Sequence, residues 1–223
     1  MAMERWEMEM RRRGNVAGAE IARVLREQHG DVSLGENELE TGVSRFSSEQ
    51  RKELERQGRV IVELTGQSIK RLREQGRKFW SSWHSEHPDF ESRTSRLSEV
   101  AINPSELFLP GSNGKTLQEQ EKMIADFSKK LGRKVGGVMA IMGEAADYVD
   151  LAFAYFDKTG KYLFGEKYNY DYARTKTPSV GSSVALVGLF SRDDGLSVFS
   201  WSRDVGGFDL GWAVPLVVPV ETG

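Results

Sequence analysis

The chain has 223 residues, of which 39% are hydrophobic and 29% charged, so it can bury a core and is not a disordered chain. Its net charge is −2, from 31 basic and 33 acidic residues, which argues against a nucleic-acid binder with a globally basic surface. The absence of cysteine excludes disulfides, thiolate metal sites and thiol nucleophiles, and fits a cytoplasmic location. The N-terminus lacks the apolar core of a signal peptide, and the most apolar run, residues 212–220, is too short to cross a bilayer. We therefore expect a soluble protein without membrane contact.

The first 45 residues predict a helical arm that ends in a linker. Residues 15–29 repeat apolar side chains at helical spacing, and Asn15 is a suitable N-cap. Residues 30–45 are polar and contain glycine, as linkers do. We expect the arm to bind a protein partner or to mediate self-association, and residues 46–223 to form one α+β globular domain.

The middle of the chain alternates short elements. The pattern Ser47-x-x-Gln50 predicts a capped helix, and "EVAI" at 99–102 predicts a strand. Residues 58–84 have two interpretations: a strand followed by a short basic helix over about 67–76, or one long helix. We favour the first, because the long helix would contain three glycines that cost ~1 kcal/mol each.

The second half predicts a helix over 116–131, a buried strand in "GGVMAIMG", and a helix in "EAADYVDLAFAYFDKTG" that could instead be a hairpin arm. From "KYLFGEKYNYDY" onwards the chain is β in character. Asp194-Gly195 is a hairpin signal, so about 183–218 predict an antiparallel meander. The predicted fold class is α+β: a helical N-terminal arm followed by a mixed domain, with a C-terminal antiparallel β-sheet packed by two or three helices.

Gly114-Lys115-Thr116 resembles the end of a phosphate-binding loop, G-x-x-x-x-G-K-[ST]. The position five residues before Gly114 holds Leu109 instead of glycine, so the loop cannot wrap a phosphate in that way. Thr116-Leu-Gln-Glu119 instead has the form of a capping box at a helix start. An anion held at this helix start by Lys115 and Thr116 stays physically allowed.

An aromatic strand supplies a second candidate. In an extended chain Tyr168, Tyr170 and Tyr172 share one face, with Arg174 and Lys176 following. Such a face could stack on a base, sugar or peptide, with the cations suited to an anionic ligand. Packing of the tyrosines against a helix is the more common outcome.

A basic segment rich in tryptophan supplies a third candidate, for partner binding. Over 67–87 the cations are interleaved with aromatic side chains, and the candidate contacts are Arg73, Arg77, Lys78, Trp80, Trp83 and His84. A protein partner is favoured; nucleic acid is possible but not favoured. Two tryptophans three residues apart are also common in helix cores.

No complete catalytic or metal-binding constellation appears. His84-x-x-His87 offers two nitrogens and no third in sequence, and no G-x-S-x-G nucleophile motif occurs. We expect no metal and no cofactor. Two hypotheses follow: a non-catalytic interaction protein that uses the basic tryptophan segment and the aromatic strand face, or an enzyme or ligand-binding domain for a phosphorylated or aromatic small molecule.

Overall fold

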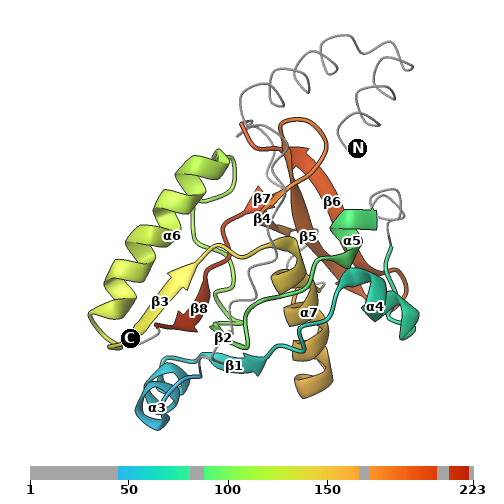
Figure 1. Cartoon of the computed structure of the whole chain (residues 1–223). Coiled ribbons are helices and arrows are strands. Elements are labelled where there is room, and N and C mark those ends of the chain that lie inside the picture. Colours follow the sequence, from blue (N-terminus) through green and yellow to red (C-terminus); the bar gives the residue numbers. More distant parts are fainter. Residues whose placement is uncertain (1–44, 81–87, 166–170, 205–210, 221–223) are drawn as a thin grey trace, which may run out of the picture. The chain divides into compact units, whose positions relative to one another are not determined.

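The computed structural model describes residues 45–80, 88–165, 171–204 and 211–220 and shows a mixed α+β fold (Figure 1). Two four-stranded sheets form its framework, one of them curled into a half-barrel. The elements in chain order are α3 (Ser48–Arg56), β1 (Val60–Glu63), α4 (Ile69–Glu74), α5 (Pro88–Ser92), β2 (Glu99–Ile102), α6 (Leu117–Gly132), β3 (Val138–Ile141), α7 (Ala145–Thr159), β4 (Tyr172–Pro178), β5 (Ser183–Ser191), β6 (Gly195–Ser202), β7 (Gly211–Trp212) and β8 (Leu216–Pro219). The predicted helical arm lies outside the described residues. No helix in the described ranges is long and apolar enough to span a membrane.

The first sheet has the strand order β1-β2-β8-β3, and its neighbouring strands run antiparallel. The β1–β2 pair places Val60 opposite Ile102. The last strand in the chain, β8, lies between β2 and β3, with Val217 opposite both Ala101 and Ala140. The sheet therefore depends on a strand from the far end of the sequence.

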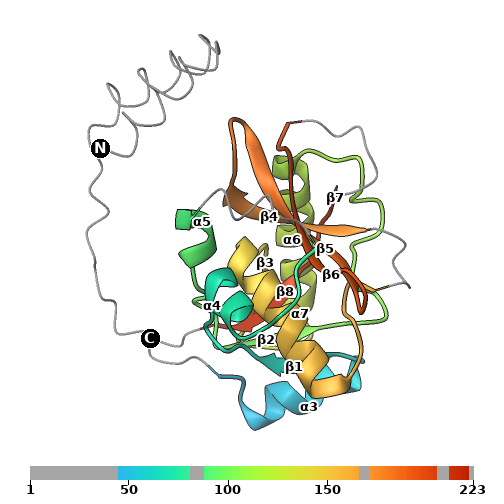
Figure 2. The same ribbon diagram turned by 90° about the vertical axis from the view of Figure 1, so that its right-hand side faces the viewer.

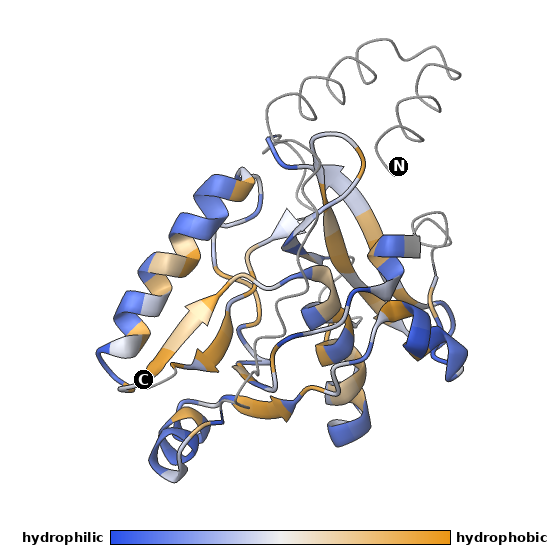
Figure 3. Cartoon of the chain, viewed as in Figure 1, coloured by the Kyte–Doolittle hydropathy of each residue, from blue (hydrophilic) through white to orange (hydrophobic). Residues whose placement is uncertain are grey.

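The central strands of this sheet, β2 and β8, are covered on both faces, and successive side chains enter different cores because a strand alternates its faces. Val62 of β1 packs in the same cluster as α7, whereas Ile61 packs with α6. On β8, Leu216 and Val218 face the α7 cluster and Val217 faces the α6 cluster. Figure 2 shows the same strands from the side, and Figure 3 shows hydrophobic residues on the strands and hydrophilic ones over much of α6. A fully apolar strand such as β8 suits this doubly covered position.

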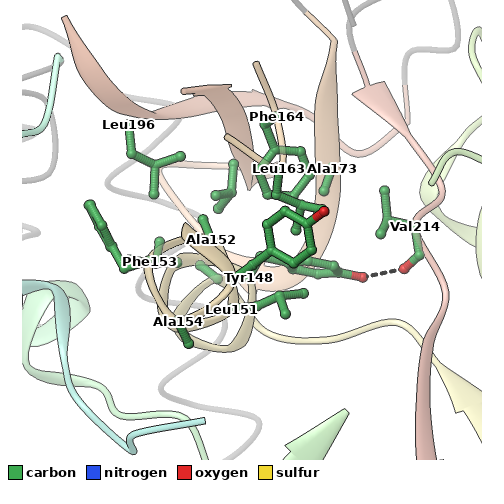
Figure 4. Packing of buried hydrophobic residues seen from close by; sticks show 14 of the residues in the cluster. Tyr148, Leu151, Ala152, Phe153, Ala154, Leu163, Phe164, Ala173, Leu196 and Val214 are labelled. Atoms are coloured by element: carbon green, nitrogen blue, oxygen red, sulfur yellow. Dashed lines mark hydrogen bonds between the residues drawn. The ribbon is translucent and has the colours of Figure 1, made fainter. Parts of the chain in front are cut away.

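Helix α7 is the centre of the larger core (Figure 4). Every residue from Ala145 to Tyr155 is buried, as expected for a helix that is surrounded by protein. Tyr148 donates its hydroxyl proton to the Val214 carbonyl at 2.6 Å, so this fully buried polar group is satisfied. The helix ends at Gly160, whose φ of 68° is the left-handed conformation that glycine adopts easily.

The second sheet has the order β6-β5-β4-β7, and here the predicted meander over 183–218 is wrong beyond Ser202. The hairpin of β5 and β6 forms as predicted, with Ser191 opposite Gly195. However, β7 pairs in parallel with β4, and β8 leaves this sheet for the first one. The physical reason is burial: the uniformly apolar β8 is stabilised most where both of its faces are covered.

Several predicted elements are confirmed. The strand-then-helix interpretation of residues 58–84 is correct for the described part, since β1 and α4 are separate elements. Both capping boxes form, one at Ser47 and Gln50 and the other at Thr116 and Glu119. The predicted strand that starts at "KYLFG" is wrong over residues 161–165, which form a turn that buries Leu163 and Phe164.

Candidate ligand pocket

A pocket of about 380 Å³ opens beside the long connection between β2 and α6. It is built from four separate stretches of chain, and its lining residues are Arg59, Asn103, Glu106, Leu107, Phe108, Leu109, Pro110, Phe127 and Pro215. Most of these side chains are apolar, with one guanidinium, one carboxylate and one amide among them. Small-molecule sites have this composition, an apolar wall with a few oriented polar groups, and start near this volume.

Arg59 is the positive group of the pocket. It directly precedes β1, and its backbone N–H donates to the Leu54 carbonyl at 3.0 Å, which ties it to the end of α3. Its guanidinium carbon lies 5.3 Å from the centre of the Phe127 ring, a cation–π contact. The Nε atom is buried and has no hydrogen-bond partner among the residues that the structure describes. A planar donor without an acceptor is suited to a carboxylate or phosphate oxygen.

The charge on Arg59 is partly unfavourable in this environment. Burial lowers the pKa of Arg59, while the negative charge of Glu106 raises it again without cancelling the effect of burial. An additional anion at the Nε atom would therefore stabilise the charged form.

Asn103 and Glu106 shape the polar edge of the pocket. The Asn103 amide donates to Glu106 Oε2 at 3.3 Å, and its side-chain oxygen accepts from the Ser105 N–H at 3.0 Å. The backbone closes the same turn, with the Glu106 N–H 3.2 Å from the Asn103 carbonyl. The turn thus holds one carboxylate beside the guanidinium, in the loop that follows β2.

Aromatic packing holds the wall of the pocket that contains Phe108. The Phe108 ring lies 5.5 Å from Trp212 and 6.5 Å from Phe164, measured between ring centres. The Leu109 N–H donates to the Ala213 carbonyl at 2.9 Å, which joins the loop to the β7–β8 connection. These contacts give the pocket a preformed aromatic wall, because both the loop and the ring are held by the core.

None of the residues proposed from sequence lines this pocket. Arg59, Asn103, Glu106 and Phe108 belong to no sequence motif, and Phe127 lies within the helix predicted over 116–131. The sequence contains only weak signals for this pocket, an arginine directly before a strand and an apolar loop next to a proline. Neither signal shows that the two segments lie side by side in the fold.

The basic tryptophan segment is largely engaged within the fold. Arg73 forms an ion pair with Glu91 at 2.9 Å, and Arg77 forms one with Asp157. Lys78 donates to the Asp193 carbonyl. Trp80, in contrast, is 55% exposed, while Trp83 and His84 lie outside the described residues.

The aromatic strand face and the capped helix start are brought together in part. Tyr172 is buried and donates to Ser197 Oγ at 3.3 Å, and Tyr168 and Tyr170 lie outside the described residues. The Arg174 Nη1 donates to the Lys115 carbonyl at 3.0 Å, directly before the Thr116 cap. The Lys115 ammonium lies 4.0 Å from Glu119, whose side chain also accepts from the Thr116 N–H. The Thr116 and Glu119 amides at this helix start are therefore occupied by the cap.

Two buried carboxylates on α7 have structural partners. Asp147 accepts from Ser95 Oγ at 2.6 Å and from the Glu144 N–H at 2.8 Å. Asp150 accepts from the Thr65 N–H and the Gly66 N–H, each at 2.8 Å. Within the described ranges, no group of three or more potential ligands is arranged to hold a metal ion. Both carboxylates therefore act as anchors between α7 and neighbouring loops.

Comparisons of the chain with models of known protein families, with curated protein sequences and with solved structures found no match.

Proposed function

We propose that this protein is a non-catalytic binding protein, and that the Arg59 pocket holds a small molecule with a flat apolar body and an anionic group. The observation that supports it is the Arg59 guanidinium, stacked on Phe127 with an unpartnered Nε atom. The anionic group would accept from Arg59, and the apolar body would lie against Phe108 and Phe127. This ligand class is that of the second hypothesis from the sequence, which placed it at Lys115 and the tyrosine strand face instead of at Arg59.

The residue types that line the pocket favour ligand binding over catalysis. The described residues around the pocket include no serine, threonine, lysine or histidine, and thus no ordinary nucleophile or general base apart from Glu106. Glu106 is exposed and accepts from Asn103, an arrangement that orients the loop.

A matched pair of probes tests this function. We expect benzoate and phenyl phosphate to bind with measurable affinity in titration calorimetry, and neutral benzamide to bind more weakly. The Arg59→Met variant should lose about tenfold to hundredfold in affinity for the anions, the range that a charge-assisted hydrogen bond contributes. Phe127→Ala should weaken the anions and benzamide together.

Two further variants sharpen the result. Glu106→Gln removes the carboxylate beside Arg59, so we expect tighter binding of the anionic probes. Arg133→Met removes an exposed arginine that follows the end of α6 and should leave the affinity unchanged. Equal affinity of wild type and Arg59→Met for benzoate, or no binding by any probe, would contradict the proposal.

A second proposal retains the basic tryptophan segment as a surface for self-association or for a protein partner. It is supported by Trp80, whose ring is largely exposed although the cations around it serve the fold. We expect Trp80→Ala to weaken concentration-dependent self-association in sedimentation velocity, and deletion of residues 1–44 to weaken it further. Val180→Ala, a comparably exposed apolar position, is the control. Unchanged sedimentation of both test variants would rule out this surface for self-association.

A further inference from the structure

The Arg59 pocket carries two opposite charges that do not pair with each other. Among the described residues that line it, Arg59 and Glu106 are the charged ones. They lie near enough for the Glu106 charge to raise the pKa of Arg59. Within the described part of the chain, however, no nitrogen–oxygen distance of 4.0 Å or less joins the two side chains. One cavity of about 380 Å³ therefore has a positive and a negative group on its wall, held apart.

Separate contacts hold each of these charges in its place. The Arg59 backbone N–H donates to the Leu54 carbonyl at 3.0 Å, and its guanidinium carbon lies 5.3 Å from the centre of the Phe127 ring. Glu106 Oε2 accepts from the Asn103 amide at 3.3 Å. Because a direct ion pair would require one side chain to leave its contact, the separation of the two charges is built into the fold.

A ligand with a single negative charge leaves this site unbalanced. Such an anion is attracted by Arg59, but it is repelled by the carboxylate of Glu106 on the same cavity. A ligand that also directs a positive group at Glu106 converts the repulsion into an attraction. The two charges of the lining sum to zero, so a zwitterion complements them better than a plain anion does.

An α-amino acid carries both groups on one carbon atom. Its carboxylate would accept from the Arg59 Nε atom, which is buried and lacks an acceptor among the described residues. Its ammonium would donate to Glu106 Oε1, since only Oε2 accepts from Asn103. The volume of the pocket lies near the lower end for small-molecule sites, which suits one amino acid, and Phe108 and Phe127 offer rings for an aromatic side chain.

We propose that the Arg59 pocket recognises free aromatic α-amino acids as zwitterions, with Arg59 binding the carboxylate and Glu106 the ammonium. This inference rests on the proposed binding function of the pocket and adds Glu106 as the residue that determines the ligand class. The last residue of a peptide has no free α-ammonium group, so the site discriminates against peptide C-termini.

Titration calorimetry at pH 7 with four related probes tests the inference. L-Phenylalanine carries both charges, 3-phenylpropanoate lacks the ammonium, and L-phenylalaninamide lacks the carboxylate. We expect phenylalanine to bind about threefold or more tightly than 3-phenylpropanoate, because the contact with the exposed Glu106 is partly screened. It should bind about tenfold or more tightly than the amide, which loses the bond to Arg59. N-Acetyl-L-phenylalanine, which mimics a peptide C-terminus, should bind no better than 3-phenylpropanoate.

The Glu106→Gln variant provides the sharpest measurement, since its effect should have opposite signs for two probes. We expect it to weaken phenylalanine about threefold or more and to tighten 3-phenylpropanoate, which the native carboxylate repels. General damage to the pocket would weaken both probes together. Glu74→Gln removes an exposed carboxylate on α4, outside the pocket, and should change neither affinity.

The failure of this inference can be told from the failure of the proposed function. If 3-phenylpropanoate binds as tightly as phenylalanine, or if Glu106→Gln shifts both affinities in the same direction, the zwitterion inference is wrong. The pocket would then remain an anion site, provided that Arg59→Met still weakens 3-phenylpropanoate. If neither phenylalanine nor 3-phenylpropanoate binds to the wild type, the proposed function and the inference fail together.

Discussion

Replacing Asp150 with alanine is expected to destabilise the protein by about 2–4 kcal/mol, because it leaves three donors without their acceptor. The carboxylate of this fully buried residue accepts from the Thr65 N–H and Gly66 N–H at 2.8 Å and from Thr65 Oγ1 at 2.6 Å. It thereby ties the centre of α7 to the β1–α4 connection. Since Thr65 and Gly66 are exposed, water can bond to some of the donors that lose the carboxylate. The loss of stability is therefore smaller than it would be for donors buried away from water.

Urea unfolding of Asp150→Ala beside Asp157→Ala measures this effect. Asp157 lies on the same helix and its ion pair with Arg77 is 47% exposed on the Asp157 side, so its replacement should cost less than about 1 kcal/mol. Equal destabilisation by the two variants would show that Asp150 does not anchor the loop.

The pH dependence gives an independent check on the same residue. Burial raises the pKa of Asp150 above its ordinary value of 3.8, although the hydrogen bonds from Thr65 and Gly66 oppose the shift. The native carboxyl therefore holds its proton where the unfolded one has lost it, and its contribution to stability falls as the pH rises from 3.8 to the native pKa. We expect the stability difference between wild type and Asp150→Asn to shrink over that window; a difference that grows with pH would contradict the sign of the shift.

Replacing Gly195 with alanine is the second large effect that we expect, a loss of about 2–4 kcal/mol. Gly195 opens β6 with a φ of 86°, in the left-handed region, and a Cβ atom there would lie 2.2 Å from the Lys78 carbonyl oxygen. That carbonyl accepts from the Leu196 N–H at 3.0 Å, and the Leu196 carbonyl accepts from the Trp80 N–H at 3.1 Å. The methyl group would force apart the contact that holds the basic tryptophan segment on the hairpin.

Gly181→Ala is the matched control, because Gly181 has a φ of 64° and no atom within 4 Å of its would-be Cβ. It isolates the cost of the backbone conformation, roughly 1 kcal/mol, from that of the contact. Chemical denaturation and amide exchange at Leu196 and Trp80 measure both variants. If Gly195→Ala costs no more than Gly181→Ala, the close approach of Lys78 does not constrain the fold.

Short-range signals predicted the local elements well. Thr116 and Glu119 cap α6 because their partners are three residues apart, so no other part of the chain is needed to form that contact. The Asp194-Gly195 turn and the Gly160 terminus of α7 follow from backbone preferences of the same kind. These interactions join residues that are close in sequence, so the sequence pattern is enough to predict them.

Such short-range signals could not predict which strands and charged side chains pair across long stretches of sequence. The apolar run of β8 predicted a strand, but its place between β2 and β3 depends on residues more than 70 positions away. The basic segment illustrates the same limit, since a row of cations looks like a binding surface until Glu91, Asp157 and the Asp193 carbonyl are found opposite them. Opposite charges meet through the fold, not through their spacing in sequence.

By itself, the sequence determined the α+β class, the capped helices, the hairpin turn and the lack of any complete catalytic motif. Only the tertiary structure decided where a ligand could bind. It brought Arg59 over Phe127 beside the loop of Asn103 and Glu106. The pocket consists of single residues from distant segments, and only folding removes the Arg59 Nε atom from water.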